Sequence, residues 1–225
     1  LAAAPATLPA DYEVDESFPH PQANDLDKVA CVVDAVSAGA NTPEAVADAL
    51  GLHPREGAYY ADAAGYLGLV ERVPGEEITT YATTSLGNDL AVSDEQDRAT
   101  LVREMVAHVP AVAIYDAEGD EAVVAFLSTE GLGESTAARR AATIRSWVHQ
   151  TADPGSLAGA VRVTQTETIH RAADAAEKAG AAAEERRRIR GAAQVREMPP
   201  CPSCFMQLPS SGICDCGYEM EAAAA

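Results

Sequence analysis

The chain has 225 residues, a length that suits one or two small domains. Hydrophobic residues make up 47% of it, yet only 5% are aromatic and alanine is abundant, so we expect helices around thin cores rather than one large globule. The net charge is −19 and the only lysines are Lys28 and Lys178, a surface composition typical of halophilic proteins, although a GC-rich genome would produce a similar bias.

Residues 1–22 combine Pro, Ala and acidic side chains, and this composition predicts a disordered acidic arm. They lack the basic start and the sustained apolar stretch of a signal peptide. No apolar run in the chain approaches the roughly 20 residues that a membrane helix needs. Because most of the cysteines cluster near the C-terminus and no export signal is visible, we expect a cytoplasmic protein that makes no contact with membranes.

Residues 23–92 show three short helices followed by a hairpin. The first two helices carry start signals, a capping side chain and a Thr-Pro pair. Two β-prone runs then flank a Pro-Gly turn, and a further helix follows. This order predicts a winged helix-turn-helix domain. The elements are expected at residues 24–38 (capped by Asn24 or Asp25), 42–50, 55–66, 69–73, 78–81 and from 84 onward.

Residues 93–166 show a similar but less regular order of helices, and we predict a second winged-helix-like domain there. Its longest helix, over residues 135–150, resembles the start of a recognition helix. An alanine-rich helical connector is expected over residues 167–197. Within the second domain we expect helices at 93–108, 120–127 and 135–150, an apolar segment at 109–116, a turn at 128–133 and a wing strand at 160–166.

The four C-terminal cysteines predict a zinc ribbon over residues 198–220. Cys201 and Cys204 form one pair and Cys214 and Cys216 the other, with nine residues between the pairs. Four thiolates suit a closed tetrahedral zinc site with no open position, so the zinc would be structural. The alternative is a set of redox-active or free thiols.

Two helices carry candidate DNA contacts. For the third helix, the alternative to DNA contact is protein contact or dimerisation, with the tyrosines packed in a core. For the helix at 135–150, the alternative to phosphate binding is an arginine face that is simply solvated. The negative net charge does not exclude DNA binding, because the Debye length falls to about 3 Å at 1 M salt and long-range repulsion is screened. The candidate contacts are Arg55, Tyr59, Tyr60, Arg139, Arg140 and Arg145.

Catalytic motifs are absent from the sequence. Neither lysine completes the acid-x-Lys pattern of a restriction-type nuclease, and no Gly-rich phosphate loop with Lys-Ser/Thr occurs. The histidines show no paired metal-ligand spacing, and no serine lies in a G-x-S-x-G turn. We therefore do not expect an enzyme.

The motifs FPHPQANDLDKVACVVDAV and ADALGLHPREGAYYADAAGYLGLVER resemble a winged-helix domain of proteins associated with prokaryotic restriction–modification systems. The later STAARRAATIRSWVHQ is similar to a helix that follows in that family, and CPSCFMQLPSSGICDCG resembles a ribbon found near such modules. The resemblance implies tandem DNA-binding elements with the six contacts above. No nuclease domain accompanies them here.

The expectation is a mainly α protein with small β wings, made of tandem winged helix-turn-helix domains plus a zinc ribbon, that binds double-stranded DNA. It would act as a transcriptional regulator or as the DNA-recognition component of a restriction or defence system. The alternative is a protein–protein interaction adapter that uses acidic winged helices and the ribbon. The sequence is also compatible with protein partners and with a homodimer. It does not specify which DNA sequence is recognised or which genes are regulated.

Overall fold

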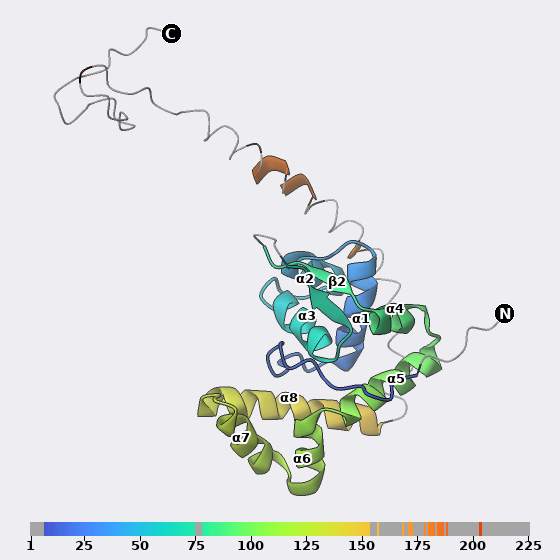
Figure 1. The fold of residues 1–225 in the computed structure, drawn as a ribbon, viewed down its shortest axis with the longest axis vertical. Helices are drawn as coiled ribbons and strands as arrows, with labels where there is room; N and C mark the ends of the chain where they lie inside the picture. Colours follow the sequence, from blue (N-terminus) through green and yellow to red (C-terminus); the bar gives the residue numbers. More distant parts are fainter. Residues whose placement is uncertain are drawn as a thin grey trace. The chain divides into compact units, whose positions relative to one another are not determined.

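The computed structural model describes residues 7–153 apart from 75–77, and a few single positions beyond them (Figure 1). The chain divides into two compact units, Leu1–Ala179 and Gly180–Ala225, and every element named below lies in the first. The described part is mainly helical with one small two-stranded sheet, as the sequence predicted. The single positions are 157, 168, 171, 172, 178, 180–182, 184–186, 188 and 203.

The first half of this unit has the predicted order of three helices, a hairpin and a further helix. Three of these four helices begin where a capping side chain satisfies a backbone donor. The Asp25 carboxylate accepts from the Lys28 backbone N–H, and Thr42 Oγ1 accepts from the Ala45 N–H at 3.2 Å. The elements are α1 (Leu26–Ser37), α2 (Pro43–Leu50), α3 (Gly57–Tyr66), β1 (Val70–Arg72), β2 (Tyr81–Thr83) and α4 (Ser85–Val92).

Two element boundaries differ from the prediction. Helix α3 begins at Gly57 rather than at residue 55, and the Pro43 carbonyl oxygen lies 1.9 Å from where a Cβ on Gly57 would be, so only glycine lets α3 start against α2. Strand β2 covers Tyr81–Thr83 rather than 78–81. The buried Tyr81 fixes this position, because its backbone N–H donates to the Asn41 oxygen at 2.8 Å while Tyr81 pairs with Arg72 of β1.

The second half of the unit consists of helices in its described part, residues 93–153. Helices α6, α7 and α8 pack on one another, and α5 packs on α8. Helix α6 replaces the apolar segment predicted at 109–116, because Pro110 occupies its first turn. The predicted wing strand at 160–166 lies outside the described residues. The elements are α5 (Glu95–Ala107), α6 (Pro110–Glu118), α7 (Asp120–Thr129) and α8 (Glu134–Ala152).

A continuous apolar core joins the two halves. It extends from Phe18 in the N-terminal segment to Leu157, so the boundary predicted at 92/93 does not separate two compact units. Trp147 of α8 is fully buried in this core, and its Nε1–H donates to the Ala23 oxygen at 2.8 Å. The C-terminal half of α8 therefore completes the core beside the start of α1, a contact between distant parts of the sequence.

A buried ion pair also connects the halves. Asp34 of α1 and Arg98 of α5 form a bidentate pair with N–O distances of 3.3 and 2.5 Å, and their side chains are 3% and 1% exposed. Arg98 donates further to the backbone oxygens of Ala30 at 2.7 Å and Leu90 at 3.3 Å. Buried charges need such partners, so the position of α5 on α1 is closely specified.

The prediction of a disordered arm over residues 1–22 is wrong for its described part, residues 7–22. The Tyr12 hydroxyl donates to the Leu67 oxygen at 3.1 Å, and the Asp15 N–H donates to the Tyr66 oxygen at 2.9 Å. Phe18 is 5% exposed, and its ring lies where a side chain at Gly65 would be, with 2.3 Å from the nearest ring atom to that Cβ position. Burial of one phenylalanine thus outweighs the polar composition of the segment.

The C-terminal predictions fall largely outside the described residues. The positions described within the predicted connector at 167–197 are helical. The cysteines of the ribbon at 198–220 are not among the described residues. In the part that the structure describes, no cluster of three or more His, Cys, Asp or Glu side chains could hold a metal ion. None of the helices described there combines the length and apolar character needed to cross a membrane.

Candidate nucleic-acid interface

The exposed side of α3 carries two of the predicted contacts. Arg55 is exposed just before the helix, and its backbone N–H donates to His53 Nδ1 at 3.3 Å. Tyr59 is 41% exposed. Both side chains lie at the start of α3, which is the part of a recognition helix that meets base edges in helix-turn-helix proteins.

Tyr60, by contrast, is a core residue, so the prediction that it contacts DNA is wrong. It is 6% exposed, and burial raises the pKa of its phenol to about 12. The sequence contained a signal for this, because Tyr60 lies three and four positions from the buried Gly57 and Ala64 and shares their helix face. Its hydroxyl donates to Asn24 Oδ1 at 3.5 Å.

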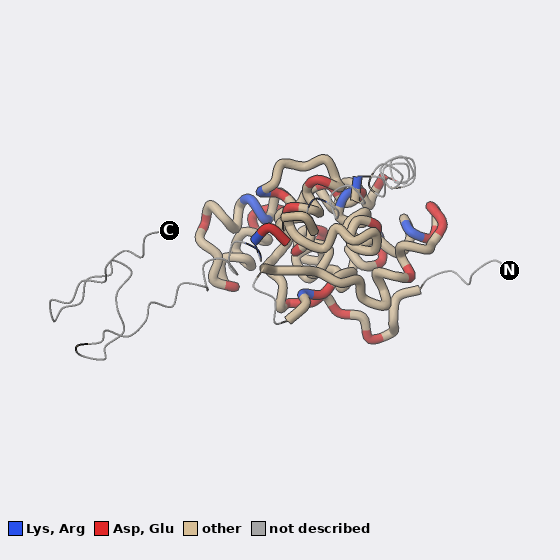
Figure 2. Tube along the Cα trace, turned by 90° about the horizontal axis from the view of Figure 1, so that it is seen from above, with Lys and Arg blue, Asp and Glu red and all other residues tan. Residues whose placement is uncertain are grey.

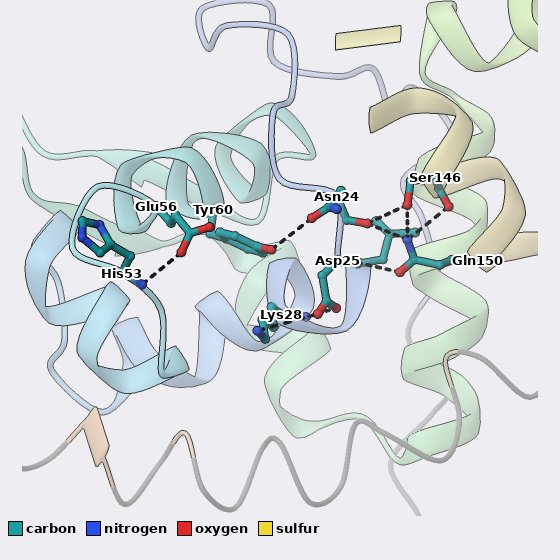
Figure 3. A network of polar contacts seen from close by, with 9 residues as sticks. Asn24, Asp25, Lys28, His53, Glu56, Tyr60, Ser146 and Gln150 are labelled. Carbon is teal, nitrogen blue, oxygen red and sulfur yellow. Dashed lines mark hydrogen bonds and ion pairs between the residues drawn. The ribbon is translucent and has the colours of Figure 1, made fainter. Parts of the chain in front are cut away.

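Asn24 connects α3 with α8 (Figure 3). While its side chain accepts from Tyr60, its backbone oxygen accepts from Ser146 Oγ at 3.0 Å and from Gln150 Nε2 at 2.6 Å. Gln150 Oε1 also accepts from the Leu26 N–H at 3.0 Å. These bonds link α3 to α8 through Asn24.

The three arginines of α8 differ in their exposure and in their bonding partners. Arg139 is exposed and bonds to the Ser135 oxygen and Thr136 Oγ1, both at 3.4 Å. Arg140 is half-buried. Arg145 forms an exposed ion pair with Asp120 of α7. Among the described residues, neither Arg139 nor Arg140 has a carboxylate within ion-pair distance.

The structure brings Arg140 beside the exposed side of α3. A small pocket of ≈ 80 Å³ has Arg140 in one wall and Tyr59 and Asp62 in another, with the segment from Pro19 to Gln22 completing it. Candidate contacts from two separate sequence motifs therefore share one surface. Nothing in the local sequence pattern indicated this meeting, because about 80 residues of chain separate the two positions.

The electrostatics of this surface favour an anion. Burial, and then the neighbouring Arg139, lower the pKa of the Arg140 guanidinium, whereas Tyr59 and Asp62 act in the opposite direction. The Arg140 Nε is buried without a hydrogen-bond partner in the described structure. A phosphate or carboxylate placed beside the guanidinium would relieve the repulsion between two adjacent cations.

The acidic residue on the same side of α3 is already neutralised. Asp62 Oδ1 accepts from Arg72 Nη2 at 2.9 Å and from the Tyr81 hydroxyl at 3.2 Å. The Arg72 guanidinium also lies 4.2 Å from the centre of the Phe18 ring, a cation–π contact. Arg72 is thus held by the domain itself, and the hairpin presents the exposed apolar side chains Val73 and Ile78.

Acidic residues are spread along most of the trace, whereas Lys and Arg occur in a few short stretches (Figure 2). With a net charge of −19, long-range attraction to DNA is absent, and any binding of polyanions depends on local clusters. The adjacent Arg139 and Arg140 form such a cluster.

The fold and this surface define a mainly helical protein with a small hairpin and an arginine-bearing face shared by α3 and α8. The chain matches the family described as Domain of unknown function (DUF7226) over residues 28–152, more than half of its length, and it belongs to that family. No curated protein and no solved structure matches the chain. The matched region extends from α1 to the end of α8, so it includes both halves of the shared core.

Proposed function

We propose that the chain is a double-stranded DNA-binding protein in which residues 23–92 form a winged helix-turn-helix domain. Helices α3 and α8 contribute to one DNA-binding surface. The observation that carries the proposal is the position of Arg140 beside Tyr59, with Arg139 adjacent and an unpartnered, buried guanidinium donor among the described atoms.

The surface residues have different roles in this proposal. Arg139 and Arg140 bind phosphates, which positions the duplex without selecting a sequence. Arg55 and Tyr59 lie at the start of α3, where base edges in the major groove are read. Arg145 contributes less, because Asp120 competes with phosphate for its guanidinium. Tyr60 does not contact DNA but fixes α3 relative to α8.

The biological role that fits is a transcriptional regulator, or the DNA-recognition component of a restriction or defence system, in the cytoplasm. The protein itself is not an enzyme in this proposal. Residues 93–166 form the second, winged-helix-like part, with α7 and α8 as its helix-turn-helix pair. Residues 198–220 form a ribbon that holds one structural zinc ion. Its ligands are Cys201, Cys204, Cys214 and Cys216.

A protein–protein interaction adapter is the second candidate, and the hairpin is the observation that favours it. Val73 and Ile78 are 38% and 42% exposed, and Arg72 is engaged by Asp62 and Phe18. A wing that binds DNA would instead present cations to the phosphate backbone. An exposed apolar wing fits a protein surface better.

DNA binding can be tested by mobility shift and fluorescence anisotropy on random duplex DNA from about 0.1 M to about 3 M KCl. The test variant is Arg139→Ala with Arg140→Ala. The charge-matched control is Arg186→Ala with Arg188→Ala, which removes two exposed cations elsewhere. The test variant should weaken binding about tenfold or more, and should lower the slope of log K against log salt by about 2. The control should stay within about threefold of the wild type.

The outcomes separate the two candidate functions. Binding that depends on Arg139 and Arg140 supports the DNA-binding proposal. If the wild type binds no duplex at any salt concentration, and a Val73→Ser and Ile78→Ser variant loses a partner that the wild type retains, the adapter is the correct function.

A further inference from the structure

A second, larger pocket also has Arg140 in its wall. Its volume is ≈ 550 Å³, within the range of about 300–1,000 Å³ usual for small-molecule sites. The walls come from the N-terminal segment, α3, the start of α6, α7, the turn after α7, and α8. The residues that define its chemistry are Phe18, His20, Tyr66, Phe126, Leu132 and Arg140.

Four aromatic rings contribute to the walls of this pocket, those of Phe18, His20, Tyr66 and Phe126. The His20 ring lies 6.1 Å from the Phe126 ring at an interplanar angle of 73°, and 5.9 Å from the Tyr66 ring, measured between centroids. Burial lowers the pKa of His20 below its usual value, so the ring is neutral near pH 7 and adds aromatic surface rather than charge. Edge and face contacts with a flat ring are therefore available on several sides.

Arg140 supplies the polar anchor. Its buried Nε–H has no partner among the described residues, and the guanidinium has the planar fork that matches a carboxylate. The Tyr66 phenol stays protonated and can donate, because burial and the nearby Glu16 raise its pKa to about 12. Thr136 adds a hydroxyl to the same wall.

The acidic side chains at the rim of the pocket restrict the charge of the anion that can bind. Glu16 and Glu130 line the pocket but are exposed, so they are hydrated, whereas Arg140 is half-buried. A dianionic phosphate would meet two carboxylates and one guanidinium. A monoanion with an apolar body meets less repulsion and uses the aromatic walls.

We propose that this pocket binds a small aromatic monocarboxylate, with the carboxylate on Arg140 and the ring among Phe18, Tyr66 and Phe126. A second consequence rests on the proposed DNA binding. Arg140 belongs to both sites, so the carboxylate and DNA compete for one guanidinium, and the ligand acts as a negative effector of DNA binding.

The direct test titrates benzoate into the full chain and follows binding by calorimetry and NMR shifts, with benzyl alcohol and acetate as matched probes. Benzyl alcohol keeps the ring without the charge, and acetate keeps the charge without the ring. Benzoate should bind about tenfold or more tightly than either probe, which corresponds to about 1.4 kcal/mol. Equal binding of benzoate and benzyl alcohol, or no binding of benzoate, overturns the proposal and requires no variant.

Two substitutions locate the site. Arg140→Gln should abolish the preference for benzoate over benzyl alcohol, while Arg186→Gln, at an exposed position that does not line the pocket, should leave it within about twofold. Thermal unfolding of both variants checks that they fold. If Arg140→Gln folds and binds benzoate like the wild type, the pocket is not the site.

Competition on duplex DNA separates the two proposals. Benzoate should weaken DNA binding by the wild type, and benzyl alcohol should not. If benzoate binds through Arg140 while no DNA binds at any salt, the pocket stands and the DNA-binding proposal fails. If DNA binds through Arg139 and Arg140 while benzoate does not bind, the pocket fails and the DNA surface stands.

Discussion

Replacing Asp34 by alanine should destabilise the whole of the first compact unit, because it leaves the guanidinium of Arg98 buried without its ion-pair partner. The two side chains are 3% and 1% exposed, so water cannot replace the lost carboxylate without opening the core. Breaking such a buried pair typically destabilises a protein by about 3–5 kcal/mol. Against a total of about 5–15 kcal/mol for a folded domain, this is a large fraction.

The reciprocal and double variants determine the coupling between the two residues. Arg98→Met removes the cation and its bonds to the Ala30 and Leu90 oxygens, and it deprives the buried Asp34 carboxylate of its ion pair with Arg98, so it should be destabilising on its own. The double variant removes both charges. We expect it to be less destabilised than the sum of the single variants, with a coupling of about 2 kcal/mol. An exposed control, Asp89→Ala on α4, should stay within about 0.5 kcal/mol of the wild type.

Urea unfolding followed by two probes provides the measurement. Far-UV circular dichroism reports on all helices, whereas fluorescence of the single tryptophan, Trp147, reports on the core beneath α8. If one core joins the halves, Asp34→Ala shifts both transitions together, although Asp34 and Trp147 lie on different helices. A loss of less than about 1 kcal/mol, or a shift in circular dichroism alone, would refute the shared core.

Three further predictions follow from other parts of the chain. Phe18→Ala should lower the free energy of unfolding by about 3 kcal/mol and expose the N-terminal segment to limited proteolysis, since the ring fills the space over Gly65. Asp27→Asn should be more stable than the wild type at about pH 7.5 but not at about pH 4, as measured by urea unfolding. Burial, and then Asp25, raise the pKa of Asp27 to about 6, so its ionisation above that pH opposes folding and its protonation at low pH removes the penalty. The purified chain should contain about one zinc ion by elemental analysis, and Cys201→Ser with Cys204→Ser should lose it; a metal-free wild type would contradict the ribbon.

The elements of the first half could be predicted because their signals are local. Asp25 and Thr42 cap helices with bonds to residues three positions away, and such bonds are visible in a sequence. Helix α6 was missed because no polar capping side chain precedes it, although Pro110 after Val109 was an available start signal. The position of Tyr60 on the buried face of α3 could also have been identified from helical periodicity.

Contacts between distant segments could not be predicted in this way. Neither Phe18 in a polar segment nor Gly65 in an alanine-rich helix indicates by itself that the two meet. The ion pair of Asp34 with Arg98 joins positions 64 residues apart, and each residue alone suits a solvated helix face. The same limit applies to the candidate site, where Arg139 and Arg140 were visible as a pair but their approach to Tyr59 was not.

Two groups of described arginines differ in their partners, those paired with carboxylates of the fold and the adjacent pair on α8. Three ion pairs between different elements engage described arginines with carboxylates of the fold: Arg98 with Asp34, Arg72 with Asp62 and Arg145 with Asp120. These pairs join distant elements, so their positive charge stabilises the fold and is not available to a ligand. Arg139 and Arg140 lie next to each other on α8 without such a carboxylate in the described structure. We therefore propose that an external anion is the partner of this pair, and its binding should weaken as the salt concentration rises, because counterions screen the contact itself.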